Sequence, residues 1–307
     1  MSFDLESCEN SESSGCSIED KLPSKNCLIR GKDSVYAVGK KVAQGRYGAV
    51  YEVLRRSDGK PFACKLEICE AHSHGLDQDY SVMTKAAKRG AENLVRMIDR
   101  GKIEEHFKFI IMPLLGENLM NLRFLFEDGR FSLSTGLRLA LFAIQPIQSL
   151  HQLGYVHRDI KASNFCIADP QMLHQNPEAL KLCLIDYGIC RSFKDKSGEL
   201  KTPRTDIKFR GTNRYASLAA HYGDEQSAKD DMESWFYMMI ELISGNLPWS
   251  FMHRDQHKEV EFHRIQAYLM GLKYQNTVDY TFISEMVQLA MRNNGVRMNE
   301  KFDWQED

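Results

Sequence analysis

The pattern of hydrophobic and polar positions changes character near residue 112. Before that point, short runs typical of β-strands alternate with polar stretches; they cover residues 36–43, 49–54, 61–68, 93–98 and 107–112. One helical stretch, at about 76–87, interrupts them. After residue 112, apolar residues recur at three- and four-residue spacing over 133–153 and 233–243, as they do in helices. The pattern predicts an α+β fold with a small β-rich lobe that has one main helix, followed by a larger, mainly helical lobe.

The first 30 residues have a different character from the rest of the chain. They show no periodicity and are rich in Ser, Glu and Asn, a composition that buries too little apolar surface to fold. We therefore expect residues 1–30 to be a disordered tail. The chain has 307 residues, enough for one large core or two adjoining ones, and no internal repeat of a solenoid or propeller is visible.

Composition narrows the possible partners and the compartment. Forty basic and 42 acidic residues give a net charge of −2, so the chain has no general attraction to nucleic acid or an anionic membrane. No apolar run approaches the roughly 20 residues of a membrane span, and the N-terminus does not resemble a secretory signal. The eight cysteines form no CxxC pair, which favours free thiols over disulfides or a zinc site. We expect a cytoplasmic, or nuclear, monomer without nucleic-acid or membrane partners.

Two weak signals for nucleotide binding lie in the first lobe. The segment AQGRYG at 43–48 separates two strand-like runs, and its glycines would let backbone amides approach phosphates, which makes Ala43, Gly45 and Gly48 candidates. Ordinary hairpin turn chemistry explains the same glycines. In the next strand, Lys65 is placed to reach the α- and β-phosphates, although most strand lysines only face solvent.

The strong chemical signal is a pair of polar motifs in the second lobe. The first is HRDIKASN at 157–164, and the second is DYG at 186–188, which closes the apolar run 180–185. Phosphoryl transfer needs a carboxylate to accept the proton of the attacking hydroxyl, magnesium ligands, and cations on the developing charge. Asp159 is predicted as the base and Lys161 as the cation. Asn164 and Asp186 offer the oxygen ligands that Mg²⁺ prefers.

Together these motifs resemble those of the protein kinase superfamily. Within it, GTNRYAS at 211–217 stands where an Ala-Pro-Glu segment is usual, which is similar to the casein kinase I group. The same group is indicated by LLG at 114–116, EQ at 225–226, DDMES at 230–234 and NLPW at 246–249. The tau-tubulin kinase branch is the most similar part of that group, on PR at 203–204, FRGT at 209–212 and FDW at 302–304. The resemblance covers residues 36–304.

The resemblance implies a two-lobed protein kinase fold over residues 31–307, with an N-lobe at about 31–112, a hinge at 113–116 and a C-lobe at 117–307. It implies a protein serine/threonine kinase with ATP and Mg²⁺ as cofactors. Met112 would be the gatekeeper beside adenine, and Pro113 to Leu115 the hinge, where only the carbonyl of Pro113 is needed and Leu115 supplies the amide. Val50 and Ala63 would sandwich the adenine ring.

The resemblance also implies two roles for aspartates. Asp79 matches the helix acid that pairs with Lys65, although a glutamate is usual there and Asp77 is an alternative. Asp231 matches the aspartate that holds the backbone of the catalytic loop. Its helix, MESWFYMMIELI, is apolar almost all round, which predicts a position in the middle of the lobe.

A basic segment bears on substrate choice. It consists of Lys201, Arg204, Lys208, Arg210 and Arg214. Arginine binds phosphate and carboxylate in a bidentate manner, so we expect protein substrates with acidic or already phosphorylated Ser/Thr sites, bound through Arg204, Arg210 and Arg214. A solvated basic face is the alternative interpretation.

Three departures from the kinase pattern leave other functions open. Ala43 replaces the first glycine of the loop, Asp79 is one methylene shorter than glutamate, and Pro146 lies inside the long helix of the second lobe, where proline costs about 3 kcal/mol or a kink. A kinase-fold scaffold with little turnover is therefore the second hypothesis, and a small-molecule kinase the third. The presence of Lys65, Asp159, Asn164 and Asp186 together favours an active protein kinase.

Overall fold

The structure is a computed structural model, and it describes residues 21–69, 74–171, 176–195, 197–247 and 260–305. Contacts along the chain divide it into two compact units. Unit 1 comprises Met1–Ser73 and Asp99–Ile111, and unit 2 comprises His74–Ile98 and Met112–Asp307. Strands dominate unit 1 and helices dominate unit 2, so the predicted α+β fold is confirmed.

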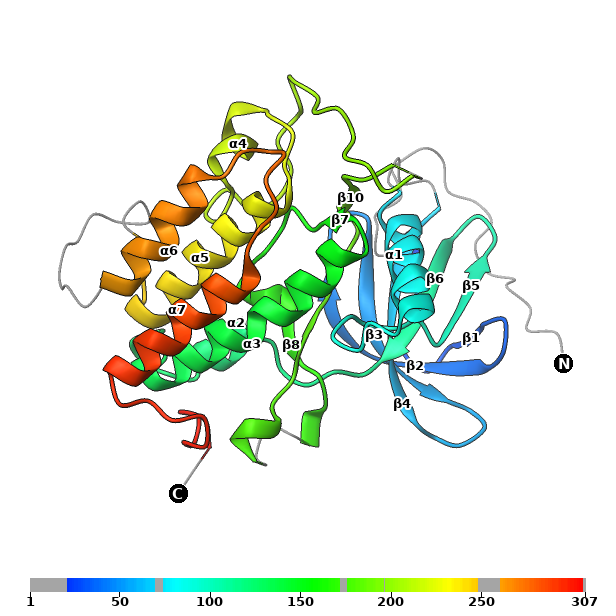
Figure 1. Ribbon diagram of the computed structural model, residues 1–307. Coiled ribbons are helices and arrows are strands. Elements are labelled where there is room, and N and C mark those ends of the chain that lie inside the picture. The colour runs from blue at the N-terminus through cyan, green and yellow to red at the C-terminus, as the bar shows by residue number, and fades with distance from the viewer. Residues whose placement is uncertain (1–20, 70–73, 172–175, 196, 248–259, 306–307) are drawn as a thin grey trace, which may run out of the picture. The chain divides into compact units, whose positions relative to one another are not determined.

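Unit 1 is built on a six-stranded sheet with the order β1-β2-β3-β4-β6-β5 (Figure 1). Its strands are Leu28–Arg30 (β1), Val35–Gln44 (β2), Gly48–Arg55 (β3), Pro61–Ile68 (β4), Asp99–Ile103 (β5) and Phe107–Pro113 (β6). Strands β2, β3 and β4 pair in antiparallel register. The alternation of the sequence places Tyr51, Val53, Cys64 and Leu66 on the buried face, which is the core of this unit.

The sequence predictions were wrong for two segments, residues 28–30 and residues 93–98. Leu28–Arg30, within the predicted disordered tail, form β1, because Ile29 is buried and the strand pairs with β2; residues 1–20 of that tail lie outside the described residues. The apolar run 93–98 is not a strand, since Leu94 makes only an isolated bridge to Leu184. The edge strand is β5 instead, whose sequence DRGKI is too polar to show a strand pattern.

The predicted helix at 76–87 is α1 (Gly75–Arg89), and it ends at Gly90 in the left-handed conformation that glycine favours. It belongs to unit 2 rather than to the strands that precede it. Asp79 accepts a hydrogen bond from the amide of Tyr187, and the hydroxyls of Ser81 and Tyr155 lie 3.3 Å apart. Contacts distant in sequence thus decide where the helix packs.

Unit 2 is mainly helical. Its helices are α1, α2 (Leu119–Arg123), α3 (Leu133–Gln152), α4 (Leu218–Tyr222), α5 (Ala228–Ser244), α6 (Val260–Gly271) and α7 (Tyr280–Asn293). Helix α5 lies beside α3 and α6 (Figure 1). Trp235, Met238 and Met239 of α5 are fully buried, and the Trp235 indole N–H donates to the Ala140 carbonyl of α3. The predicted central position of this helix is confirmed, and α3 continues through Pro146.

Two short ribbons carry the loops of unit 2. Tyr155–Val156 (β7) pairs with Arg191–Ser192 (β10), and Phe165–Ile167 (β8) pairs with Leu182–Leu184 (β9). Two single turns of 3-10 helix, Ala162–Asn164 (η2) and Pro177–Ala179 (η4), lie next to β8 and β9. Because β8 and β9 are antiparallel, the residue before β8 and the residues after β9 meet at one end of the ribbon.

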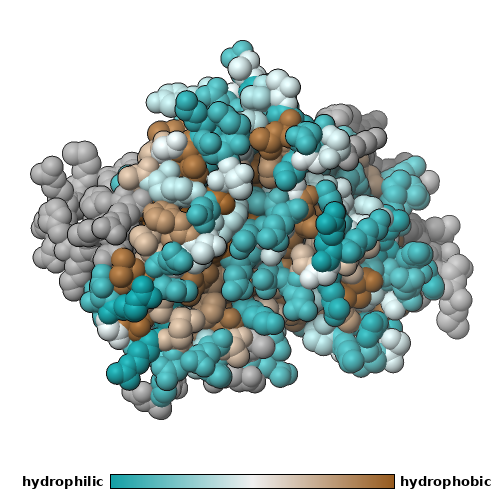
Figure 2. Space-filling model, in the orientation of Figure 1, coloured by the Kyte–Doolittle hydropathy of each residue, from teal (hydrophilic) through white to brown (hydrophobic). Residues whose placement is uncertain are grey.

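The surface and the thiols agree with the composition. The face of the molecule in Figure 2 is predominantly hydrophilic, with dispersed hydrophobic residues. Within the described ranges, every helix is too short or too polar to cross a bilayer, and all six cysteines are free thiols.

The buried carboxylate of Asp99 stabilises the turn between β1 and β2 in unit 1. Asp99 is 3% exposed and accepts hydrogen bonds from five donors: the amides of Lys32, Asp33, Ser34 and Arg100 and the hydroxyl of Tyr36. Burial and the hydrogen bond to Asp99 raise the pKa of Tyr36 to about 12. A side chain at Gly31 would meet the Asp99 carboxylate at 2.2 Å, so the turn closes tightly around it.

Replacing Asp99 with alanine is expected to destabilise the fold by about 3 kcal/mol, because buried donors would lose their acceptor. Urea denaturation followed by circular dichroism measures the change. Asp58→Ala is the control, since Asp58 is paired with Arg55 at the surface and should leave the denaturation midpoint nearly unchanged. Equal shifts for the two variants would contradict the role of Asp99.

Candidate active site

The loop 157–164 joins β7 to β8 and is held by the first turn of α5. Asp231, 1% exposed, accepts hydrogen bonds from the amides of His157 at 2.6 Å and Arg158 at 2.8 Å. Its Oδ2 also lies 2.7 Å from Nε2 of His151 in α3. Burial alone raises the pKa of the Asp231 carboxyl, but these hydrogen bonds and the charge of His151 bring the pKa below its usual value. The prediction that Asp231 holds the backbone of the loop 157–164 is confirmed.

The backbone of this loop is strained at one residue. Arg158 has a positive φ of 68°, a conformation that non-glycine residues rarely adopt. The two amide bonds to Asp231 stabilise it, and so does its side chain, whose Nε and Nη2 donate to the Ile189 carbonyl at 2.8 and 2.5 Å. Such strain persists only where several contacts fix it, and here it sets the direction of the residue that follows.

That residue, Asp159, lies between a cation and a hydroxyl. Lys161 Nζ is 2.7 Å from Asp159 Oδ2, and the Thr212 hydroxyl donates to Asp159 Oδ1 at 2.7 Å. Lys161 also donates to Thr212 Oγ1 at 3.3 Å. Only 11% of the Asp159 side chain is exposed. Its carboxylate is therefore fixed in direction and held beside the positive charge, as the predicted base and cation require.

The two predicted metal ligands lie at one end of the β8–β9 ribbon. Asn164 precedes β8, and its Nδ2 donates to the Asp159 carbonyl at 2.8 Å. The amide of Ile185 donates to the Asn164 carbonyl at 2.9 Å, which places Asp186 immediately beyond. An amide oxygen and a carboxylate on adjacent chain ends fit a Mg²⁺ ion whose other ligands are water and phosphate oxygens. The described residues hold no cluster of three His, Cys, Asp or Glu side chains that could bind a metal, and the roles of Asn164 and Asp186 stay predictions.

In unit 1, the predicted phosphate loop is the turn between β2 and β3. Ala43 pairs with Val50 in the ladder, and the Gly45 amide donates to the Gly48 carbonyl at 2.9 Å. A side chain at Gly48 would meet the Leu66 carbonyl oxygen at 1.9 Å. Glycine at 48 is therefore required by the close approach of β4, whatever the turn binds.

The predicted adenine and phosphate contacts of unit 1 share a sheet face. Val50 is directly opposite Lys65, and Ala63 is opposite Glu52, so all of them lie on the face away from Tyr51 and Leu66. Val50 and Lys65 are half-buried, unlike the core face. Their positions fit the predicted roles, which stay predictions.

The predicted hinge follows β6. Met112 and Pro113 are its last two residues, and both are half-buried, as is Leu115. The next residue, Gly116, donates its amide to the Ile167 carbonyl at 2.9 Å, and Ile167 donates to Glu117 at 3.0 Å. These two bonds fix the end of the hinge segment to β8, close in sequence to Asn164.

Asp79 and Asp77 of α1 are the two candidates for the acid that pairs with Lys65, and they differ in burial. Asp79 is fully buried and accepts the Tyr187 amide at 2.8 Å. The Asp77 side chain is 60% exposed and lies 3.5 Å from His74. Asp79 thus contacts the Asp186 motif directly, and its pairing with Lys65 stays a prediction.

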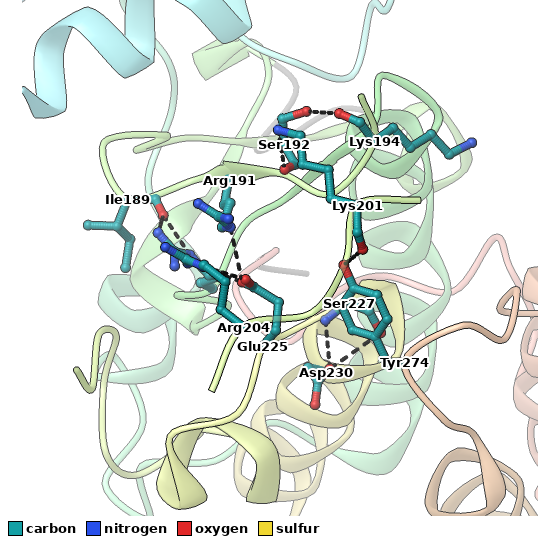
Figure 3. A network of polar contacts seen from close by, with 11 residues as sticks. Ile189, Arg191, Ser192, Lys194, Lys201, Arg204, Glu225, Ser227, Asp230 and Tyr274 are labelled. Carbon is teal, nitrogen blue, oxygen red and sulfur yellow. Dashed lines mark hydrogen bonds and ion pairs between the residues drawn. The ribbon is translucent and has the colours of Figure 1, made fainter. Parts of the chain in front are cut away.

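Two arginines of the basic segment are paired with buried carboxylates, Arg204 with Glu225 and Arg214 with Glu241. Glu225, whose side chain is 3% exposed, lies 3.0 Å from Arg191 and accepts two hydrogen bonds from Arg204, at 2.6 and 3.3 Å. Figure 3 shows both arginines pointing to Glu225 from different parts of the segment 189–217, with Tyr274 donating to the Lys201 carbonyl nearby. Burial raises the pKa of Glu225, but the Arg204 hydrogen bond and the charge of Arg191 outweigh it, so the pKa is lowered.

Arg214 is held in a similar way. Its Nη1 lies 2.7 Å from Oε1 of Glu241, which is 1% exposed in α5. The other oxygen, Oε2, lies 3.2 Å from Arg123 of α2 and accepts the Tyr215 hydroxyl. Half of the Arg214 side chain is nevertheless exposed. Glu241 therefore fixes the direction of Arg214 without burying it.

Sequence reasoning missed three residues of this site. Thr212 was part of a recognised motif but had no assigned role, whereas Glu225 and Glu241 were not predicted as partners of the arginines. Thr212 could have been found from its motif. The glutamates could not, because they lie 21 and 27 residues from their arginine partners and have no spacing signal.

Comparison with known proteins agrees with this geometry. The protein kinase domain family matches residues 36–298. The chain is 32% identical over 295 residues to a probable serine/threonine-protein kinase of Dictyostelium discoideum, covering 91% of this chain but 57% of that protein. It is 28% identical over 312 residues to the serine/threonine-protein kinase spe-6 of Caenorhabditis elegans, covering 93% of this chain and 80% of that protein.

A third relative is a probable casein kinase I homolog of Encephalitozoon cuniculi, 31% identical over 290 residues that cover 86% of this chain and 91% of that protein. The chain thus spans little more than half of the Dictyostelium protein but most of the other two. From the domain match, these relatives and the geometry of the loop 157–164, the chain belongs to the protein kinase family and is a protein serine/threonine kinase.

Proposed function

We propose that the protein transfers the γ-phosphate of ATP to Ser or Thr residues of acidic or phospho-primed protein substrates, in the manner of casein kinase I. The observation that carries the proposal is the carboxylate of Asp159, held between Lys161 and Thr212 at 2.7 Å from each. The predicted metal ligands Asn164 and Asp186 follow at the end of the adjoining ribbon.

Each group has a defined task in this reaction. Asp159 orients the substrate hydroxyl and accepts its proton, and Thr212 keeps the carboxylate pointing one way. Lys161 places positive charge where negative charge develops on the transferred group. Asn164 and Asp186 would hold Mg²⁺, which neutralises phosphate charge when bound. Lys65 would orient the nucleotide phosphates.

The charges around Glu225 support an acidic substrate. Arg191 and Arg204 pair with Glu225. Burial first, then the positive charge of Arg210 and Arg191, lowers the pKa of Arg158, so these arginines lie within electrostatic reach of one another. A group of arginines in which one glutamate is the paired acid leaves a net positive field, which favours a carboxylate or phosphate in the substrate. Arg214, fixed by Glu241 but half-exposed, adds a further cation on the same segment.

The relatives favour the casein kinase I type. Two of the proteins that match the chain are named as casein kinase I homologs, those of Encephalitozoon cuniculi and Kluyveromyces lactis. The motif GTNRYAS and the residues around α5 point to the same group. The tau-tubulin kinase branch is the finer form of this proposal, and it rests on the short motifs at 203–204, 209–212 and 302–304.

A transfer assay tests the proposal. The purified protein with radiolabelled ATP should phosphorylate casein or an acidic peptide, and chelation of Mg²⁺ should abolish the signal. Peptides that differ only in acidic, neutral or basic flanking residues should rank in that order of kcat/KM. Equal rates on all three peptides would refute the substrate preference, and no transfer to any of them would refute the enzymatic proposal.

Arg214→Ala is expected to lower kcat/KM on a phospho-primed peptide by about tenfold, since a charge-assisted hydrogen bond is lost. The unphosphorylated form of the same peptide should lose less than twofold. Arg292→Ala, which removes an exposed arginine of α7, is the matched control and should change neither rate. An equal loss on both peptides would show that Arg214 stabilises the segment rather than reading the substrate.

A further inference from the structure

Asp186 has an unfavourable backbone conformation that the structure must stabilise. Its φ is 66°, in the left-handed region where a residue with a side chain is energetically disfavoured. Conformations of this kind persist at functional sites when several surrounding contacts stabilise them. The next residue, Tyr187, is fully buried and supplies the contacts that do so.

The hydroxyl of Tyr187 bonds two backbone segments that are far apart in sequence. It accepts a hydrogen bond from the Val95 amide at 3.0 Å and donates one to the Leu184 carbonyl at 2.5 Å. Val95 lies in the loop after α1, and Leu184 is the last residue of β9. The hydroxyl is therefore used as donor and as acceptor, and both partners are buried.

The rest of Tyr187 is fixed as well. Its amide donates to Asp79 of α1 at 2.8 Å, and its carbonyl accepts the Cys190 amide at 2.9 Å. The ring packs edge-on against His157, with 6.1 Å between ring centroids. Tyr187 thus joins α1, the loop after it, β9 and the start of the catalytic loop, all within unit 2.

A phenylalanine is the usual residue after this aspartate in protein kinases, and it could supply the ring contact but not the two hydroxyl bonds. Without the hydroxyl, the buried Val95 amide would lose its acceptor, which is costly. The tyrosine of this chain therefore adds a constraint beyond packing, next to the strained residue.

We propose that the Tyr187 hydroxyl is a latch that holds Asp186 in its left-handed conformation and so positions this carboxylate for the metal–nucleotide complex. Tyr187 is a positioning residue that touches neither metal nor substrate in this role. The positioning of the Asp186 carboxylate for the metal–nucleotide complex rests on the proposed function, whereas the effect of the hydroxyl on the Asp186 backbone does not.

Tyr187→Phe is the decisive variant because it keeps the ring and removes only the hydroxyl. Hydrogen–deuterium exchange of the nucleotide-free protein should show amides in a peptide covering 184–190 exchanging at least threefold faster than in the wild type. Tyr237→Phe is the matched control: it removes a partly buried hydroxyl that bonds to Glu233 at 2.9 Å in α5, and it should leave this peptide unchanged. Unchanged exchange in Tyr187→Phe would overturn the latch, whether or not the protein is an active kinase.

The second measurement is the Mg²⁺ concentration for half-maximal transfer at saturating ATP. It should rise about three- to tenfold in Tyr187→Phe, while kcat at saturating Mg²⁺ changes less than threefold. A variant that was merely less stable would lose melting temperature without this change in Mg²⁺ dependence. If exchange rises but the Mg²⁺ dependence stays at the wild-type value, the hydroxyl holds the backbone without positioning Asp186, and the proposal fails. Failure of the proposed function would instead show as no transfer by the wild-type protein.

Discussion

Asp159→Asn is expected to lower kcat for phosphate transfer about 10³-fold, within the range for loss of a general base. An amide has nearly the same shape as the carboxylate but cannot accept the proton. It also cannot pair electrostatically with Lys161, which lies 2.7 Å from Asp159 Oδ2. Steady-state assays on an acidic peptide measure the loss.

The same variant should keep its fold and its nucleotide affinity. Its melting temperature with and without Mg²⁺–ATP should match the wild type, because Asp159 is not assigned to the nucleotide. Asp169→Asn, an exposed residue of the same unit, is the control for replacing an aspartate. A drop in kcat of less than tenfold would mean that Asp159 is not the base.

Asp231→Asn is expected to reduce both activity and stability. The amide group of asparagine would face an N–H donor of His157 or Arg158, so one of the two amide bonds must break. Removing one partner from a buried charged network costs about 3–5 kcal/mol, and the free loop should lower kcat by about 10²-fold through misplacement of Asp159. Urea denaturation and steady-state kinetics measure the two effects.

Glu233→Gln provides the comparison on the same helix. Glu233 is buried, accepts the Leu218 amide and the Tyr237 hydroxyl through Oε1, and burial raises its pKa above the usual value. A neutral side chain that retains an acceptor oxygen should therefore be tolerated there, within about 1 kcal/mol. If the two variants were equally destabilised, Asp231 would not have the special role of anchoring the loop.

The pH dependence of stability follows from the same carboxyl. The folded-state pKa of Asp231 is lowered, mainly by the hydrogen bond and charge of His151 acting against burial. The unfolded value is about 3.9, so this contribution is fully present above that pH and is lost as the pH falls through the folded-state pKa. The wild type should lose stability more steeply than Asp231→Asn below pH 4.

Local patterns were sufficient for the four longest strands and the three longest helices of the described residues. The alternation of apolar residues predicted β2, β3, β4 and β6, and the three- to four-residue spacing predicted α1, α3 and α5. This works because a strand or helix buries one face, so its apolar residues recur along the sequence with the period of that element. The motif at 157–164 was informative for a related reason: its chemistry is concentrated in consecutive residues.

The run 93–98 shows where such patterns fail. Leu94 and Val95 are buried, but Val95 donates to Tyr187 and Leu94 bridges to Leu184 instead of entering the large sheet. Conversely, the polar strand β5 forms because it pairs with β6 at the sheet edge. Apolar character indicates that a residue is buried, but only the tertiary structure determines which residues it contacts.

The sequence by itself therefore determined the fold class, the kinase motifs and the candidates Asp159, Lys161, Asn164 and Asp186. Tertiary structure decided how those residues are held: Thr212 against Asp159, Asp79 against the Tyr187 amide, and Glu225 and Glu241 against the arginines. The physical reason is that a hydrogen bond or ion pair depends on distances of about 3 Å between atoms. Separation along the chain does not limit such a distance once the chain has folded.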